Sequence, residues 1–122
     1  MFCDGLPVFD RTSDLIVNPD LGQAVAACLD GHNALLLRNH GIVTAGRSVE
    51  EAVMMAVLLE KACKVQLLAE QAGGPKASTS PEEARAKRDR IYAPAALQSA
   101  FNYCVRRHNA RHHIGCTHHH PA

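Results

Sequence analysis

The stretch that decides the fold spans residues 34–74 and reads ALLLRNHGIVTAGRSVEEAVMMAVLLEKACKVQLLAEQAGG. Its opening apolar run, residues 34–37, is too short for a helix and predicts a buried strand. Residues 42–45 predict a second strand, and residues 38–41 between the two form a tight connection that contains a glycine. We therefore expect a single histidine, His40, in the turn between two neighbouring strands.

The rest of this stretch predicts one long helix. Residues 48–51 form a capping box, in which Ser48 accepts a hydrogen bond from a first-turn amide and Glu51 reaches back. Apolar residues then recur as far as Gly73-Gly74-Pro75, which gives about 24 residues where ~11–12 is the average. Because apolar residues lie on most of its circumference, we expect this helix to be covered on more than one side, by another chain or by another part of this one.

Further elements are predicted on both sides of this stretch. Asn18-Pro19-Asp20 is typical of a helix start, and Asp30-Gly31 of a helix end. Residues 15–17 predict a brief strand, and residues 6–9 a short extended piece. After a linker at residues 76–79, a second capping box at residues 80–83 precedes a charged, solvated helix over residues 84–90. An amphipathic helix over residues 95–108 follows.

This order of elements predicts an α/β domain with helices packed on a small sheet. Residues 1–109 are assigned to the domain, and residues 110–122 to a histidine-rich tail that we expect to be disordered. Gly41 and Gly46 are interpreted as turn residues that need permissive backbone dihedrals.

Composition excludes several classes of function. The 122 residues carry a net charge of +1 and 4% aromatic residues without tryptophan, which argues against nucleic-acid binding. No run of about 18 apolar residues occurs, so no membrane span is expected. The N-terminus lacks the basic and apolar segments of a secretory signal. Five cysteines without a Cys-x-x-Cys pair indicate reduced thiols, and we expect a cytoplasmic protein.

The stretch of residues 34–74 closely resembles the C-terminal half of the class II aldolase/adducin family. The resemblance rests on the leucine-rich strand, the Arg-Asn-His-Gly turn, the second strand, Gly-Arg-Ser, and the Glu-Glu-Ala that opens the apolar helix. It implies an α/β/α layered domain, often in homotetramers. It also implies a divalent metal, usually zinc, and the cleavage or formation of carbon–carbon bonds through an enediolate. Aldolases, an epimerase and decarboxylases are members, whereas adducin keeps the fold without the chemistry.

By this resemblance, His40 matches the third metal-binding histidine of the family. The first two ligands of the family form a His-x-His pair in the N-terminal half, with a catalytic glutamate and a glycine-rich phosphate loop, and this sequence contains none of them. A catalytic zinc site needs about three protein ligands and an open position. We therefore expect this chain alone to be inactive until the missing half is supplied. The alternative is a turn histidine that hydrogen-bonds a neighbouring carbonyl.

The C-terminal segment offers a second source of metal ligands. Residues 106–122 contain six of the eight histidines together with Cys116, and such tracts take up zinc, copper or nickel. The segment around His118 and His120 resembles the His-x-His-Pro segment of the family out of order, so these two residues are candidate ligands. The alternative is a disordered tail with adventitious metal affinity.

Near the turn, Arg47 is interpreted as a contact for an anionic substrate or as a helix-capping residue. Glu50 and Glu51 are acids placed at a helix N-terminus, where the helix dipole favours them.

The resemblance thus implies a zinc-type aldolase or decarboxylase-like lyase that acts on a small oxygenated carbonyl substrate. We expect its partners to be other copies of itself or a chain that supplies the N-terminal half. Two alternatives remain: a non-catalytic assembly module, as adducin is, and a metal-binding protein that uses the histidine-rich tail.

Overall fold

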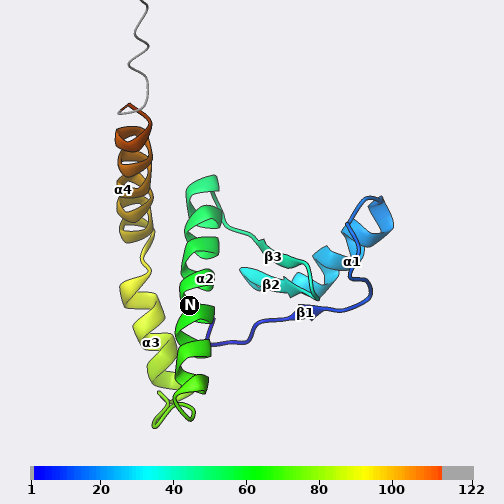
Figure 1. Cartoon of the computed structure of the whole chain (residues 1–122), viewed down its shortest axis with the longest axis horizontal. Helices are drawn as coiled ribbons and strands as arrows, with labels where there is room; N and C mark the ends of the chain where they lie inside the picture. The colour runs from blue at the N-terminus through cyan, green and yellow to red at the C-terminus, as the bar shows by residue number, and fades with distance from the viewer. Residues whose placement is uncertain (1, 114–122) are drawn as a thin grey trace, which may run out of the picture.

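The structure is a computed structural model that describes residues 2–113 (Figure 1). It contains three short strands and four helices. One helix lies between the first two strands, and three helices follow the last strand. In chain order the elements are β1 (Val8–Phe9), α1 (Pro19–Leu29), β2 (Ala34–Leu37), β3 (Gly41–Thr44), α2 (Val49–Gln71), α3 (Pro81–Ile91) and α4 (Pro94–His113).

The three strands form one mixed sheet with β2 in the centre. β1 pairs with β2 in parallel, and β2 pairs with β3 antiparallel, with Leu35 opposite Val43. The backbone N–H of Arg38 donates to the carbonyl oxygen of Phe9 (3.0 Å), which extends the β1–β2 pairing by one residue. The predicted pair of strands joined by the histidine turn is confirmed, although β3 begins at Gly41 and ends before Ala45.

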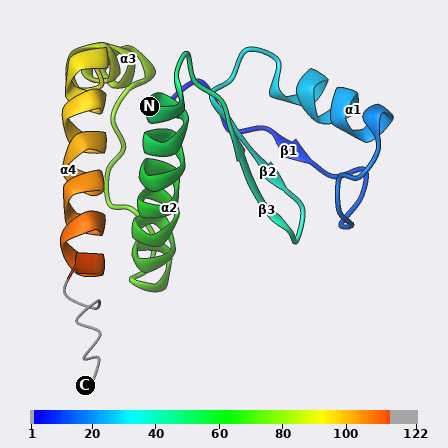
Figure 2. The ribbon, with the colours of Figure 1, turned by 90° about the horizontal axis from the view of Figure 1, so that it is seen from above.

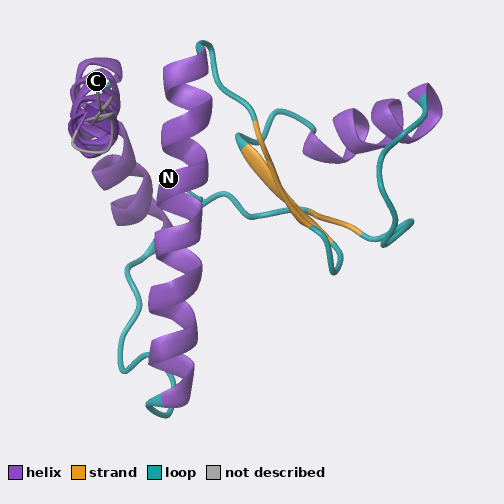
Figure 3. Ribbon diagram, turned by 45° about the horizontal axis from the view of Figure 1, so that its top comes forward, coloured by secondary structure: helices purple, strands orange, loops and turns teal. Residues whose placement is uncertain are grey.

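Helices cover both faces of this sheet (Figure 3). On one face, Val25 of α1 packs with Phe9 and Leu35 in a buried cluster. On the other face lies α2, and the hydroxyl of Thr44 donates to the carbonyl oxygen of Ala52 in that helix (3.0 Å). The predicted α/β architecture is therefore confirmed, with layers in the order α1, sheet, α2.

Helix α4 packs against the side of α2 that faces away from the sheet (Figure 2). Their contact is a second buried cluster formed by Met54 and Met55 from α2 and Leu97 from α4. The long helix is thus covered on two sides in its first half, as predicted. In its second half, Val65, Leu67 and Leu68 are all exposed. Within residues 2–113, no helix has both the length and the apolar character needed to span a membrane.

The predicted helix starts are confirmed at three places. Asn18 accepts from the N–H of Leu21, Ser48 from that of Glu51 and Ser80 from that of Glu83, at 2.8 to 3.3 Å. The capping box of α2 differs in one detail. The Glu51 carboxylate accepts from the backbone N–H of Arg47 (2.9 Å) and not from that of Ser48, so it closes the turn one residue earlier.

One predicted strand is absent, and one helix ends later than predicted. Residues 15–17 form no strand: Leu15 and Val17 are exposed, and Ile16 packs against the α1 cluster without a neighbouring strand to pair with. β-propensity depends on the tertiary context, so a short run with two β-branched residues can remain irregular. Helix α4 also continues to His113, so the segment assigned to the tail at residue 110 starts inside a helix.

The roles predicted for two glycines are wrong. Neither Gly41 nor Gly46 has a positive φ, so neither needs the left-handed backbone region. Gly46 instead allows close packing, because an added Cβ would lie 2.7 Å from the backbone nitrogen of Ala52 and 2.9 Å from the Cβ of Glu51. A Cβ on Gly41 would meet open space. Gly46 therefore sets how closely the loop after β3 approaches the first turn of α2.

We expect Gly46→Ala to destabilise the fold by about 1–3 kcal/mol, because the added methyl group meets backbone atoms that cannot rotate away. Gly41→Ala is the matched control and should change the free energy of unfolding by less than about 0.5 kcal/mol. Urea denaturation followed by circular dichroism measures both. Equal effects of the two substitutions would contradict the close-packing role of Gly46.

Candidate functional site

His40 lies at the tip of the β2–β3 hairpin, and its side chain is exposed. The hairpin tip points away from α2, α3 and α4 (Figure 2). The backbone N–H of His40 donates to the carbonyl oxygen of Leu37 (3.1 Å), and Asn39 before it has a positive φ of 54°. Asparagine tolerates this left-handed conformation better than most residues, which allows the tight turn.

The turn is fixed to the first strand by Arg38. Its guanidinium donates to the carboxylate of Asp10 (3.0 Å), directly after β1, in an exposed ion pair. Together with the backbone hydrogen bond from Arg38 to Phe9, this contact holds the start of the turn against the end of β1. The imidazole of His40 makes no hydrogen bond to any residue in the range 2–113, so its ring nitrogens are available to a ligand.

The alternative interpretation of His40 was a ring that hydrogen-bonds a neighbouring carbonyl. Such a bond is made by a different histidine, His32. The ring of His32 donates from Nδ1 to the carbonyl oxygen of Leu29 (3.0 Å), and this ring is partly buried. His32 precedes β2 and His40 follows it, so the two imidazoles lie at opposite ends of the same strand.

The residues around His40 do not complete a metal site. Within residues 2–113, no group of three or more histidine, cysteine, aspartate or glutamate side chains could hold a metal ion. His40 can supply one ligand, whereas a catalytic zinc site takes about three from the protein. The two tail candidates, His118 and His120, lie outside the described residues.

A cleft of about 490 Å³ lies at the other end of β2, away from His40. Its lining includes Asp4 from the N-terminal segment, His32, Glu51 from α2, and Arg88 and Tyr92 at the end of α3. Glu51 is already paired: the Arg47 guanidinium and then the Arg47 backbone N–H hold the pKa of this carboxyl below its ordinary value. Arg47 thus contacts the first turn of α2, which agrees with the predicted helix-capping role.

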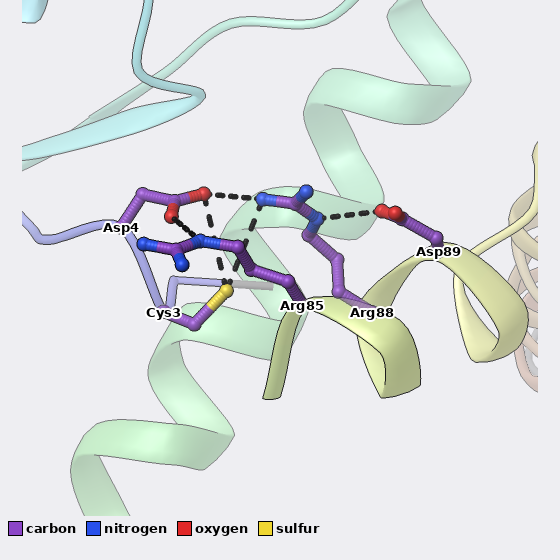
Figure 4. A network of polar contacts seen from close by, with 5 residues as sticks. All are labelled: Cys3, Asp4, Arg85, Arg88 and Asp89. Carbon is purple, nitrogen blue, oxygen red and sulfur yellow. Dashed lines mark hydrogen bonds and ion pairs between the residues drawn. The ribbon is translucent and has the colours of Figure 1, made fainter. Parts of the chain in front are cut away.

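The cleft is bordered by a charged network that sequence reasoning missed (Figure 4). Arg85 donates to one carboxylate oxygen of Asp4 (2.8 Å), and Arg88 donates to the other. Arg88 also donates to Asp89 (2.8 Å) and contacts the sulfur of Cys3. Helix α3 was predicted to be solvated, and it has no buried residue, yet these contacts fix it to the N-terminal segment. The available signal was the spacing of Arg85 and Arg88, which places both on one helix face.

The charged network also favours the ionised form of Asp4. Arg85, and then Arg88, lowers the pKa of Asp4 below 3.8, because both guanidinium groups bind its ionised form. With all of these charges paired, the cleft presents no unpaired carboxylate from Asp4 or Glu51 for acid–base work.

Comparison with known proteins gives the class of the chain. The family described as "Class II Aldolase and Adducin N-terminal domain" matches residues 1–67, which is more than half of the sequence. The chain therefore belongs to the class II aldolase and adducin family, as the turn and strand motifs predicted.

Several relatives carry enzyme names. The chain is 44% identical over 73 residues to "4-hydroxy-3-prenylphenylpyruvate oxygenase/4-hydroxy-3-prenylbenzoate synthase" of Streptomyces roseochromogenus subsp. oscitans, covering 60% of this chain and 26% of the relative. It is 43% identical over 74 residues to "Decarboxylase NovR" of Streptomyces niveus, covering 61% and 27%. It is 32% identical over 85 residues to "3,4-dihydroxyphthalate decarboxylase" of Terrabacter sp. (strain DBF63), covering 70% and 35%. The chain thus spans about a quarter to a third of the length of these relatives.

We expect the Asp4 network to make stability depend on pH. Because the pKa of Asp4 is lower in the folded state than in the unfolded state, its contribution is complete above pH 3.8 and is lost as pH falls through the folded pKa. Asp4→Asn should therefore lower the melting temperature at pH 7, and the difference from the parent should vanish at strongly acidic pH. Thermal scans of the parent and the variant, from pH 7 down to strongly acidic pH, measure this difference in melting temperature.

The control for this prediction is the same substitution in a chain that already carries Arg85→Gln and Arg88→Gln. In that background Asp4→Asn should leave the melting temperature unchanged at every pH. An equal loss of stability in both backgrounds would contradict the assignment of the effect to the two arginines.

Proposed function

We propose that this chain forms part of a metal-dependent carbon–carbon lyase of the decarboxylase or aldolase kind. The observation that carries the proposal is the His40 turn, which occupies the hairpin of a class II aldolase family domain and leaves the imidazole exposed and unbonded among the described residues. The decarboxylase names of two relatives support the reaction class.

His40 is the proposed ligand of a divalent metal, for which zinc is the proposed ion. Imidazole is the commonest protein ligand for such ions. Since no three-residue group exists in residues 2–113, the other proposed ligands lie outside this range: in the C-terminal tail with His118 and His120, in a complementing chain, or in a longer form of the protein. The Arg38–Asp10 ion pair and the backbone contact to Phe9 hold the turn in place, which fixes the direction from which His40 would approach that site.

The proposed substrate is a small oxygenated carbonyl compound that carries a carboxylate. The names of the relatives support this class, because they refer to dihydroxyphthalate and to hydroxy-prenyl-phenylpyruvate and benzoate compounds. Cys3, Cys28, Cys63 and Cys104 are all free thiols, which supports a reducing compartment such as the cytoplasm as the place of action.

The test is a hybrid protein. In it, the part of this chain that matches the Streptomyces niveus decarboxylase replaces the corresponding 74-residue stretch of that enzyme. His40→Ala in the hybrid should empty the metal site and abolish metal-dependent activity, because two remaining ligands cannot fix the ion. In the isolated chain, the same change should alter the free energy of unfolding by no more than about 1 kcal/mol, since an exposed turn side chain makes few packing contacts. Metal analysis, turnover and thermal scans measure the three effects.

His32→Ala is the matched control, because this imidazole is partly buried and bonded to Leu29. It should lower the melting temperature and leave the metal content of the hybrid unchanged. If His40→Ala left the bound metal unchanged but lowered stability, His40 would be a structural residue and the proposal would fail.

A non-catalytic assembly function is the second candidate. It is favoured by the exposed apolar residues of α2, such as Val53, Val57 and Leu67, which have no covering element in the described chain. A hybrid that binds metal but turns over no carboxylated substrate would favour this candidate over a lyase.

A further inference from the structure

One face of α2 carries a regular exposed stripe. Its positions are separated alternately by four and three residues, which is the spacing of a coiled-coil seam. We call this stripe the α2 seam, and its members are Val53, Val57, Glu60, Lys64, Leu67 and Gln71. Val53 is 40% exposed, Val57 is 44% exposed and Leu67 is 63% exposed.

The α2 seam is separate from the faces of the helix that are already used. Met54, Met55 and Leu59 are the buried residues of α2, and they lie on the side that meets the sheet and α4. With 100° between successive residues, Val53 and Val57 lie on the opposite side of the helix from Met55 and Leu59. A second helix could therefore lie along the seam without displacing an element of the chain.

The centre of the α2 seam is charged and self-complementary. Glu60 and Lys64 form an ion pair within the helix (2.6 Å), with side chains 65% and 70% exposed. If two copies of α2 lie antiparallel about a two-fold axis at residue 62, Glu60 of each copy faces Lys64 of the other. In the same register Val57 faces Leu67, and Val53 faces Gln71.

We propose that the α2 seam binds a second copy of this chain as an antiparallel helix pair. The charges select this arrangement, because a parallel pair in register would place Glu60 against Glu60 and Lys64 against Lys64. A two-fold axis makes the interface isologous, so the same residues serve both copies. The pairing leaves the hairpin that carries His40 uncovered and does not depend on the proposed lyase function.

A single helix pair is a small interface, so the dimer dissociates on dilution. Sedimentation velocity of the whole chain across the micromolar range should show a reversible monomer–dimer equilibrium. Glu60→Lys and Lys64→Glu, each alone, should raise the dissociation constant at least about tenfold, because each brings like charges together at two symmetric places. Each variant should keep the circular dichroism spectrum of the parent.

The decisive measurement mixes the two variants. In the mixture, one chain carries lysine at both positions 60 and 64, and the other chain carries glutamate at both. Every charge of one seam then faces an opposite charge on the other, so dimers should form again with an affinity near that of the parent. Lys87→Glu is the matched control, since it breaks an equivalent exposed ion pair with Glu83 (2.7 Å) on α3 and should leave the dimer intact.

Three results would overturn the proposal. A parent chain that stays monomeric at every concentration would exclude a second copy as the occupant of the α2 seam. A dimer that neither single substitution weakens would place the interface elsewhere. Single variants that weaken the dimer but do not associate with each other would exclude the antiparallel register.

Discussion

The pairing of β2 on both of its edges is the constraint on which the rest of the structure depends. Between β1 and β3, this strand places Leu35 fully buried on one face and Ala34 on the other. Leu35 packs against α1, and the face of Ala34 lies beneath α2. The four residues of β2 therefore position both helical layers. A strand whose neighbours and faces are all occupied keeps its register, because a slip of one residue would exchange the two faces.

The same strand separates two regions with different chemistry. His40 follows β2 at an exposed hairpin tip with its ring unbonded among the described residues, whereas His32 and the cleft precede it, where the charges of Asp4 and Glu51 are already paired. The proposed metal ligand, His40, therefore lies at the hairpin end of the strand and not in the cleft. The cleft end instead joins the N-terminal segment to α3 through arginine–carboxylate contacts.

Most of the fold could be predicted because its signals are local. Asn18, Ser48 and Ser80 cap helices by accepting hydrogen bonds from backbone amides three residues later. These short-range contacts follow from the residue types and their spacing in the sequence. The strand predicted at residues 15–17 is absent because β-propensity depends on tertiary context, and in this fold Ile16 packs against the α1 cluster instead. The contact of Arg88 with Asp4 joins residues 84 positions apart, which no local pattern reveals.

The sequence by itself determined the strands of the hairpin, the turn that carries His40, the starts of the helices and, through its motifs, the family. These features depend on the periodicity of apolar residues and on hydrogen bonds within a few residues. Only the tertiary structure decided that Gly46 is needed for its missing Cβ, that Arg85 and Arg88 hold Asp4, and that the α2 seam remains exposed. Each of these depends on which distant elements come into contact, and burial and close approach exist only once the layers are packed.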